Sequence, residues 1–218
     1  MKKTSSLWGT PPTRYYRYLQ RVQEHTGSAH PTLAIIGCAD GKFVLPAARR
    51  GFRVWAIDID ETALFGGYKT DPTGKVHMPG LASRVATEGL EELVEVVHGD
   101  FVESPPGRQF DAVFTSGALQ YSNNTERSLE QMVDLVGDCV RPEGLLYIDY
   151  MLPYEEKYKG RPNCPEAAWW KEYFGRHDRW DVAYHRVMPP TLDRAHVEYP
   201  VDHYHQWGHV LAQRVGHA

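Results

Sequence analysis

The sequence predicts an α/β fold with a doubly wound, mostly parallel sheet. Residues 32–58 run through an apolar strand, a loop of small residues, a helix and a second apolar strand. Further short β-rich runs follow at residues 93–98 and 110–116. Short apolar runs that alternate with helical segments are typical of parallel sheets covered by helices on both faces, so these observations favour the α/β class.

The first strand leads into a loop of small residues. The run at 32–36 ends in Gly37, and Gly37-Cys38-Ala39-Asp40-Gly41 opens a helix expected over residues 42–50. Gly51 is expected to end that helix. Glycines let a backbone approach a ligand closely, and the N–H groups at the start of a helix face it. The loop is therefore a candidate ligand site.

An acid follows the second strand, which is expected over residues 53–57. Asp58 stands 21 residues after Gly37, where an acid accepts the ribose hydroxyls of a nucleoside. The unit is thus expected to bind an adenosine-containing cofactor. Ala39 breaks the G-x-G-x-x-G pattern of a dinucleotide site. Asp40 would repel a pyrophosphate, whereas it suits the sulfonium and ammonium groups of S-adenosylmethionine.

The stretch Ile35-Ile36-Gly37-Cys38-Ala39-Asp40-Gly41 resembles the first motif of class I S-adenosylmethionine-dependent methyltransferases, an apolar strand followed by G-x-G-x-G. Two positions depart from that motif. Ile35 stands where the family has an acid that contacts the methionine end of the cofactor, and Ala39 stands where the family has its middle glycine. Asp40 is the candidate substitute for the missing acid.

Later segments extend the resemblance over roughly residues 32–150. Gly99-Asp100-Phe101 looks like the family's acid and apolar pair that holds the adenine. Residues 110–117 are similar to the fourth strand and its small-residue loop, and 119–121 follow where the family places residues between cofactor and substrate. Residues 139–149 resemble the helix end, turn and fifth strand.

The resemblance implies a Rossmann-like methyltransferase fold: a mostly parallel seven-stranded sheet flanked by helices, with a C-terminal antiparallel hairpin. It implies S-adenosyl-L-methionine as the cofactor and methyl transfer as the reaction. We expect one domain over residues 1–218, divided into an arm and helix (1–30), a cofactor-binding core (31–150) and a region for the substrate pocket and terminal hairpin (151–218). The cofactor-binding residues it implies are Gly37, Cys38, Ala39, Asp40, Gly41, Asp58, Ile59, Asp100, Phe101, Thr115 and Ser116.

Composition excludes several classes of protein. A net charge of −4 argues against a nucleic-acid-binding face. No apolar run approaches the roughly 20 residues of a membrane span, and the basic start lacks the apolar core of a signal peptide. The three cysteines have neither metal-ligand nor disulfide spacing. We therefore expect a cytoplasmic protein, monomeric or homodimeric, that acts on a small molecule without nucleic acid, membrane or metal.

The segments outside the core carry weaker signals. A helix is expected over residues 13–25, because apolar and aromatic side chains recur there at three- and four-residue steps. This helix either lies over the cofactor or packs on the sheet edge. Residues 66–80 are rich in glycine and proline without periodicity, so they are expected to form a long loop that either lines the substrate pocket or is mobile.

The last third of the chain holds seven of the eleven histidines and four of the six tryptophans. A helix is expected over residues 167–174, followed by strands near 182–187 and 206–214. The aromatic residues either form a cage for an amine or pack the core and hairpin.

The catalytic candidates are Tyr121, Asp149, His203 and His205. Asp149 ends the fifth strand, at the edge where open α/β sheets bind ligands, and otherwise caps the following loop. In an extended segment the two histidines point to one face, where they bind substrate, act as bases or hold a metal; the plain alternative is a polar surface strand. Methyl transfer needs a base only when the acceptor must lose a proton.

Three functions stay open at this point. The first is transfer of a methyl group to a small molecule, a specialised metabolite or its precursor, with nitrogen or oxygen rather than carbon or sulfur as the accepting atom. The second is a cofactor-binding protein without transferase activity. The departures from the family motif at Ile35 and Ala39 are the reason for this alternative. The third is a nicotinamide-dependent oxidoreductase, which the missing G-x-G-x-x-G pattern disfavours.

Overall fold

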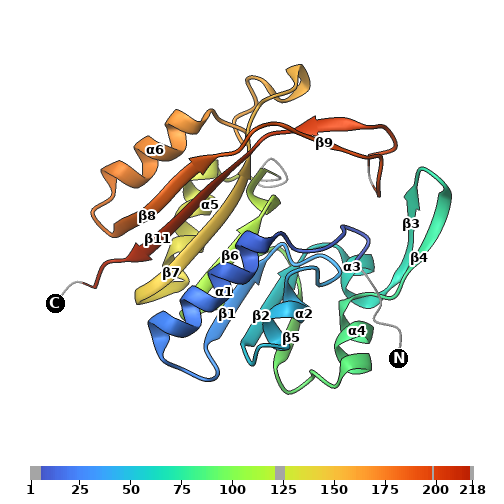
Figure 1. The fold of residues 1–218 in the computed structure, drawn as a ribbon, viewed down its shortest axis with the longest axis horizontal. Helices are drawn as coiled ribbons and strands as arrows, with labels where there is room; N and C mark the ends of the chain where they lie inside the picture. The colour runs from blue at the N-terminus through green and yellow to red at the C-terminus, as the bar shows by residue number, and fades with distance from the viewer. Residues whose placement is uncertain (1–5, 121–125, 198, 217–218) are drawn as a thin grey trace. The chain divides into compact units, whose positions relative to one another are not determined.

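The computed structural model describes residues 6–120, 126–197 and 199–216 (Figure 1). Helices and strands alternate along the first part of the chain, as expected. The helices are α1 (Thr13–Thr26), α2 (Val44–Ala48), α3 (Glu61–Phe65), α4 (Leu81–Glu88), α5 (Leu129–Asp138), the 3-10 helix η2 (Glu156–Tyr158) and α6 (Ala167–Arg176). The strands are β1 (Thr32–Ile36), β2 (Arg53–Asp58), β3 (Gly67–Asp71), β4 (Gly74–Met78), β5 (Val94–His98), β6 (Phe110–Ser116), β7 (Val140–Met151), β8 (Trp180–Val187), β9 (Thr191–Asp193), β10 (His203–His205) and β11 (Trp207–Arg214).

The strands β5, β2, β1, β6, β7, β11 and β8 form one seven-stranded sheet in this order. The neighbours β1 and β2, β2 and β5, and β6 and β7 are parallel, whereas β11 is antiparallel to both β7 and β8. This confirms the predicted fold class, a mostly parallel sheet that ends in an antiparallel C-terminal hairpin.

The described residues divide into two compact units. Unit 1 comprises Met1–Glu103 with Arg194–His203, and unit 2 comprises Ser104–Asp193 with Tyr204–Ala218. Unit 1 holds the parallel strands β5, β2 and β1 and the helices α1 to α4. Unit 2 holds β6, β7, β11 and β8, with α6 beside β8 (Figure 1).

Helix α1 forms as the sequence predicts, because its apolar and aromatic residues lie on one face. Tyr15, Tyr18, Leu19 and Val22 are all buried. The Tyr15 hydroxyl donates to the carbonyl of Phe43 over 2.7 Å, which ties α1 to the start of α2. The helix thus packs beside the loop that follows β1, and whether it also covers the cofactor stays a prediction.

Residues 66–80 do not form the expected structureless loop. Strands β3 and β4 pair antiparallel from Gly67 opposite Met78 to Asp71 opposite Gly74. Both strands are largely polar on both faces, so they lack the apolar alternation by which a strand is recognised. Gly66 and Gly80 meet at the base of the hairpin, where both have positive φ and a Cβ on either would meet backbone atoms of the other side.

The expected helix over residues 42–50 is shorter than predicted. Helix α2 spans only Val44–Ala48, and α4 ends at Glu88, where Gly89 takes a left-handed conformation. None of the helices in the described residues is long and apolar enough to cross a membrane.

Candidate functional site

The loop after β1 has a backbone that favours glycine at three positions. Gly37, Ala39 and Gly41 have φ values of 71°, 46° and 90°. A Cβ on Gly41 would lie 2.5 Å from the Leu81 side chain, and its φ of 90° favours glycine in any case. Ala39 keeps the left-handed conformation although it has a side chain, which costs about 1–2 kcal/mol.

The carboxylate of Asp58, at the end of β2, holds this loop in place. One oxygen accepts the N–H of Ala39 over 2.7 Å, and the other accepts the N–H of Asp60 over 2.9 Å. Burial raises the pKa of Asp58 above its ordinary value, more than these N–H donors lower it. A carboxylate has about four acceptor positions, so Asp58 retains capacity for ligand hydroxyls.

Asp60, the other acid near this strand, is engaged differently. Its side chain caps α3 by accepting the N–H of Ala63 over 3.1 Å, and it pairs with Lys69 of β3. The structure therefore ties Asp58 to the loop and Asp60 to the helix and hairpin, and the ribose contact of Asp58 stays a prediction.

Two further candidates follow β2 and β5. Ile59 is 52% exposed, and its predicted contact with the cofactor stays a prediction. Asp100 accepts the N–H of Val102 over 2.8 Å, and the neighbouring Phe101 is buried. Asp100 thus makes a turn after β5, which is compatible with its predicted contact to adenine but leaves that contact a prediction.

The carboxylate of Asp40 is occupied by other groups of the chain. It is only 1% exposed and accepts the Ser6 hydroxyl over 2.6 Å and the Leu7 N–H over 2.8 Å. The guanidinium of Arg84 lies 3.4 Å from it. Asp40 therefore anchors the N-terminal arm to the loop, a role the sequence did not indicate, and its predicted contact with the cofactor remains a prediction.

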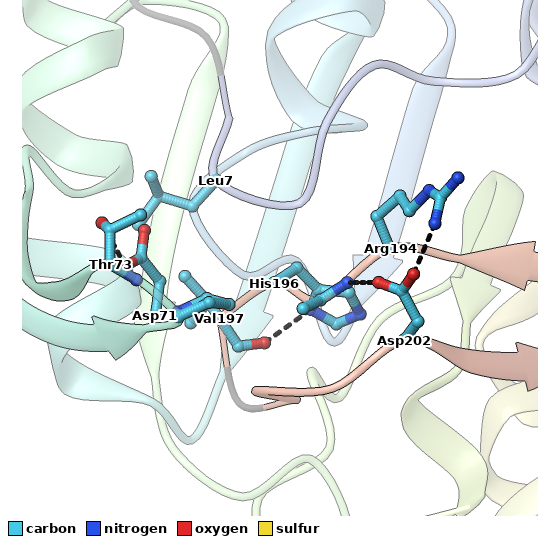
Figure 2. A pocket seen from close by; sticks show the side chains of 9 residues that line it. Leu7, Asp71, Thr73, Arg194, His196, Val197 and Asp202 are labelled. Carbon is cyan, nitrogen blue, oxygen red and sulfur yellow. Dashed lines mark hydrogen bonds and ion pairs between the residues drawn. The ribbon is translucent and has the colours of Figure 1, made fainter.

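A pocket of about 420 Å³ lies in unit 1, between the tip of the β3–β4 hairpin and the segment after β9 (Figure 2). In Figure 2 the side chains of Leu7, Asp71 and Thr73 lie on one side, and those of Arg194 and Asp202 on the other. The pocket is lined by Leu7, Asp71, Pro72, Thr73, Arg194, Ala195, His196, Val197 and Asp202. Residues 71–73 thus line a pocket, and that it is the substrate pocket stays a prediction.

Two carboxylates give this pocket its charge. Hydrogen bonds from Thr73 lower the pKa of Asp71. The Ala195 N–H and the Arg194 guanidinium lower the pKa of Asp202, and Arg194 lies 2.5 Å from that carboxylate. Both acids therefore stay ionised at neutral pH, and Arg194 balances only one of them.

Unit 2 contains a second group of polar side chains at the carboxyl ends of its parallel strands. Asp149 of β7 accepts the Ser116 hydroxyl over 3.1 Å, and its other oxygen lies 2.5 Å from Nδ1 of His209. Asp149 and His209 are 2% and 3% exposed. The sequence placed Asp149 at this edge. His209, four residues after His205 in an expected strand, belongs to the same cluster of histidines but was not among the catalytic candidates.

Tyr150 lies on the opposite face of β7 from Asp149, as alternation along a strand requires. Its ring stacks on Trp170 of α6 at 4.3 Å, and its hydroxyl pairs with His185 of β8. Gly208 lies opposite Tyr150 in the β7–β11 register, where a Cβ would overlap the tyrosine ring. The aromatic residues of α6 here pack the core, which is one of the two roles considered for them.

The remaining candidates are distributed over both units. His203 and His205 are buried while Tyr204 is exposed, so the two histidines do share a face of β10. His203 Nδ1 lies 2.9 Å from the carbonyl of Val201, and His205 Nδ1 lies 2.8 Å from Asp193. Their catalytic roles stay predictions.

For three predicted site residues the structure shows no contact that bears on their predicted roles. Tyr121 lies outside the described residues. Thr115 is fully buried. Cys38 is also buried, and burial raises the pKa of its thiol. For Thr115 and Cys38 cofactor contact remains a prediction.

The chain matches the family described as "Methyltransferase domain" over residues 35–148, more than half of its 218 residues. No curated protein matches the chain in sequence.

Several solved structures are similar in fold. Magnesium protoporphyrin IX methyltransferase from Synechocystis PCC 6803, with bound S-adenosylmethionine, is 14% identical with a TM-score of 0.60, over 93% of this chain and 78% of that one. A methyltransferase from Geobacter sulfurreducens in complex with S-adenosylhomocysteine is 12% identical with a TM-score of 0.63, over 98% and 94%. Coclaurine N-methyltransferase bound to N-methylheliamine and S-adenosylhomocysteine is 12% identical with a TM-score of 0.62, over 98% and 76%.

At these identities the likeness shows the fold, and the family match shows the family. The positive-φ loop fits the loop of the first motif, and the partly free Asp58 carboxylate fits the ribose acid expected after the second strand. S-adenosylmethionine is therefore the cofactor of this chain. The chain belongs to the methyltransferase domain family and is, in fold, a class I S-adenosylmethionine-dependent methyltransferase.

Proposed function

We propose that the chain transfers the methyl group of S-adenosylmethionine to a small-molecule acceptor, with nitrogen or oxygen as the accepting atom. The observation that carries this proposal is the Asp58 carboxylate, which holds the Ala39 N–H of the loop and keeps acceptor positions for ribose hydroxyls. In this arrangement the adenine is bound by Asp100, Phe101 and Ile59. The backbone of the loop after β1 lies against the methionine part of the cofactor.

The pocket at the hairpin tip supports a small acceptor. Its volume of about 420 Å³ falls within the roughly 300–1,000 Å³ of small-molecule sites. It is lined by apolar side chains such as Leu7 and Val197 together with the two ionised acids, which suits an acceptor with a hydrocarbon body and a basic or polar group. The fold neighbour coclaurine N-methyltransferase is bound to an N-methylated ligand, which favours a specialised metabolite and a nitrogen acceptor.

The catalysis proposed here is mainly positioning. Methyl transfer is an in-line displacement at the methyl carbon, so holding the acceptor atom in line with the carbon–sulfur bond and excluding water supply most of the rate. The bound cofactor supplies the electrophilic methyl group. The residues of the chain bind and orient the two reactants.

The first test is calorimetric titration of the wild type, Asp58→Ala and Asp60→Asn with S-adenosylmethionine, S-adenosylhomocysteine and NADH. Loss of two hydrogen bonds to a charged group, about 1.5–3 kcal/mol each, should weaken the first two ligands at least about 100-fold in Asp58→Ala. Asp60→Asn is the matched control, because asparagine caps a helix as well as aspartate does; it should bind within a few-fold of the wild type.

Radiolabelled S-adenosylmethionine then reports transfer to a panel of amines, phenols, carboxylic acids and thiols. Absence of binding by both S-adenosyl ligands would contradict the proposal. Tight binding of NADH instead would favour the oxidoreductase alternative. Cofactor binding without transfer to any acceptor of the panel would favour a cofactor-binding protein that has lost the activity.

A further inference from the structure

A short N-terminal segment of unit 1, residues 6–15, is fastened at both ends to the stretch of chain that follows β1. At one end the Ser6 hydroxyl and the Leu7 N–H donate to the two oxygens of the Asp40 carboxylate, over 2.6 Å and 2.8 Å. At the other end the Tyr15 hydroxyl donates to a carbonyl just after the loop, over 2.7 Å. We call this segment the strap. All of these residues belong to unit 1.

The first residues of the strap form a tight turn that directs its donors at Asp40. The Gly9 N–H donates to the Ser6 carbonyl, and the Trp8 N–H donates to the Ser6 hydroxyl oxygen, both over 3.1 Å. Gly9 has a φ of 77°, which glycine adopts without strain. The Ser6 hydroxyl accepts one hydrogen bond while it donates its only hydrogen to Asp40. The turn therefore fixes the direction of that hydroxyl.

The charge of Asp40 is balanced inside unit 1 by Arg84 of α4. The guanidinium lies 3.4 Å from the carboxylate and also donates to the carbonyl of Asp40. Arg84 is 5% exposed and Asp40 is 1% exposed. A buried carboxylate is strongly unfavourable unless a cation and hydrogen-bond donors satisfy it, and here the strap supplies two of the donors. The side chain of Asp40 is thus enclosed, while its backbone belongs to the loop after β1.

Leu7 is also part of the wall of the pocket at the hairpin tip. In Figure 2 its side chain lies beside Asp71 and Thr73. Among the described residues, the other lining residues come from positions 71–73 and 194–202, so Leu7 is the strap's contribution to the wall. Its N–H is the group that Asp40 holds. Asp40 therefore connects the loop expected to bind the cofactor with the pocket expected to bind the acceptor.

We propose that Leu7 is a specificity-determining residue for the methyl acceptor and that Asp40 is its positioning residue; this rests on the proposed function. The pocket is complete only while the strap is fastened, because one of its apolar side chains comes from the strap. An acceptor then meets the Leu7 side chain next to the loop that binds the cofactor. The acceptor class is a compound with a hydrocarbon group on the side that faces the strap.

The competing role for the Asp40 carboxylate is to bind the ammonium group of the cofactor. That group would have to displace one of the present donors, since the carboxylate is enclosed. Arg84, already beside the carboxylate, would repel the incoming ammonium. The two roles predict opposite behaviour of the Leu7 N–H when the cofactor binds: it stays on Asp40 if Asp40 serves the strap, and it leaves if Asp40 serves the ammonium.

The first arm of the test measures hydrogen exchange at the Leu7 amide, by NMR of the whole chain labelled with 15N, without ligand and with S-adenosylhomocysteine. We expect the amide to be protected in both states, and Asp40→Asn to raise its exchange rate about tenfold or more. Ser6→Ala leaves the charges of Asp40 and Arg84 in place and should raise the rate in the same direction if Asp40→Asn does not fold.

Two results of this arm would overturn the proposal. One is an unprotected Leu7 amide in the folded wild type. The other is protection that disappears when S-adenosylhomocysteine binds, which would assign Asp40 to the ammonium group. Absence of S-adenosylhomocysteine binding would instead contradict the proposed function, and the measurement without ligand would separate that failure from a failure of the strap.

The second arm measures KM and kcat for an acceptor that the wild type methylates. Leu7→Ala should raise KM about tenfold or more, because it removes apolar contact from the pocket. Its kcat and its S-adenosylhomocysteine affinity should stay within about twofold of the wild type, since the strap contacts neither the reacting atoms nor the cofactor in this proposal. Ser6→Ala should raise KM about threefold or more, whereas Ser6→Thr keeps the hydroxyl and should restore it.

The double variant and a matched control complete this arm. Ser6 acts through Leu7, so adding Ser6→Ala to Leu7→Ala should raise KM by less than about twofold further. Thr10→Ala removes a hydroxyl from an exposed position of the same strap and should keep the wild-type KM. An unchanged KM in Leu7→Ala would overturn the proposal, and so would an effect of Ser6→Ala that is equally large with and without the Leu7 side chain.

Discussion

Asp58 and Asp149 lie near the carboxyl ends of two parallel strands, β2 and β7, yet their surroundings differ. Asp58 accepts backbone N–H groups, and burial raises its pKa. Asp149 is bonded to two side chains, Ser116 and His209. The Asp58 carboxylate is therefore partly free for a ligand, whereas the Asp149 carboxylate orients neighbouring side chains.

The largest effect expected from this difference is on stability. Asp149→Ala should lower the free energy of unfolding by about 2–3 kcal/mol, because it leaves buried groups of His209 and Ser116 without a partner. Asp58→Ala should change it by less than about 1 kcal/mol, since water can reach the N–H groups at this partly exposed loop. Urea unfolding of both variants at pH 7 measures the difference.

The sign of the Asp58 pKa shift supports the smaller effect. A carboxyl group with a raised folded pKa contributes stability below its ordinary value of 3.8, and this contribution is lost as the pH rises through the folded pKa. At pH 7 the ionised Asp58 therefore does not stabilise the free protein. Equal losses of unfolding free energy in the two variants would contradict this prediction. If Asp149→Ala does not fold, Asp149→Asn, which preserves the side-chain volume, is measured in its place.

The two carboxylates also differ in how far the sequence reveals them. Asp58 follows a strand directly and stands at a fixed distance from Gly37, so short-range order suffices to predict it. The pairing of His209 with Asp149 joins residues 60 positions apart and depends on the register of β11 against β7. A one-residue change of register would turn His209 to the other face, and this pairing cannot be predicted from the local pattern of either strand alone.

The same distinction holds for the fold. Helix α1 could be predicted because its apolar residues follow a clear period, and the seven-stranded sheet because the motifs over residues 32–150 resemble those of a known family. The hairpin β3–β4 could not, because its strands are polar on both faces. The partners of Asp40 were missed for another reason: Ser6 and Leu7 lie more than 30 residues away in an arm without periodicity.

A second, smaller effect concerns the pH dependence of cofactor binding. Ribose hydroxyls donate to the ionised form of Asp58, so S-adenosylhomocysteine should bind less tightly as the pH falls through the pKa of that group. Because burial raises this pKa, the loss should begin at a higher pH than for an ordinary aspartate and approach about tenfold per pH unit below it. Calorimetry between pH 4 and 7 measures it, and binding should release protons near the pKa of Asp58.

The control for this prediction is Asp58→Asn, which cannot ionise at the same position. We expect this variant to bind S-adenosylhomocysteine more weakly and without the pH dependence that comes from Asp58. Asp149→Asn should keep the wild-type pH dependence of binding. If the pH dependence of S-adenosylhomocysteine binding is unchanged in Asp58→Asn, it belongs to another group. That result would contradict the proposed role of Asp58 in binding the cofactor.

The smallest effect concerns the loop that Asp58 holds. Ala39 has a φ of 46°, which is unfavourable for an L-residue, so Ala39→Gly should relieve strain of about 1–2 kcal/mol. Glycine loses more chain entropy on folding, roughly 0.5–1 kcal/mol, which leaves a net gain of about 0.5–1 kcal/mol. Thermal unfolding should show a rise in Tm of about 1–4 °C for a chain of this size.

Ala48→Gly, in the right-handed backbone of α2, is the matched control and should lower Tm, because glycine there costs about 1 kcal/mol. A fall in Tm for both variants would show that the left-handed conformation of Ala39 carries no strain. A rise for Ala39→Gly alone would show that strain is stored in the loop whose N–H group binds Asp58. Strained backbone that the surrounding structure maintains is typical of ligand-binding loops. That result would therefore support a ligand-binding role for the loop that Asp58 holds, by a measurement that needs no ligand.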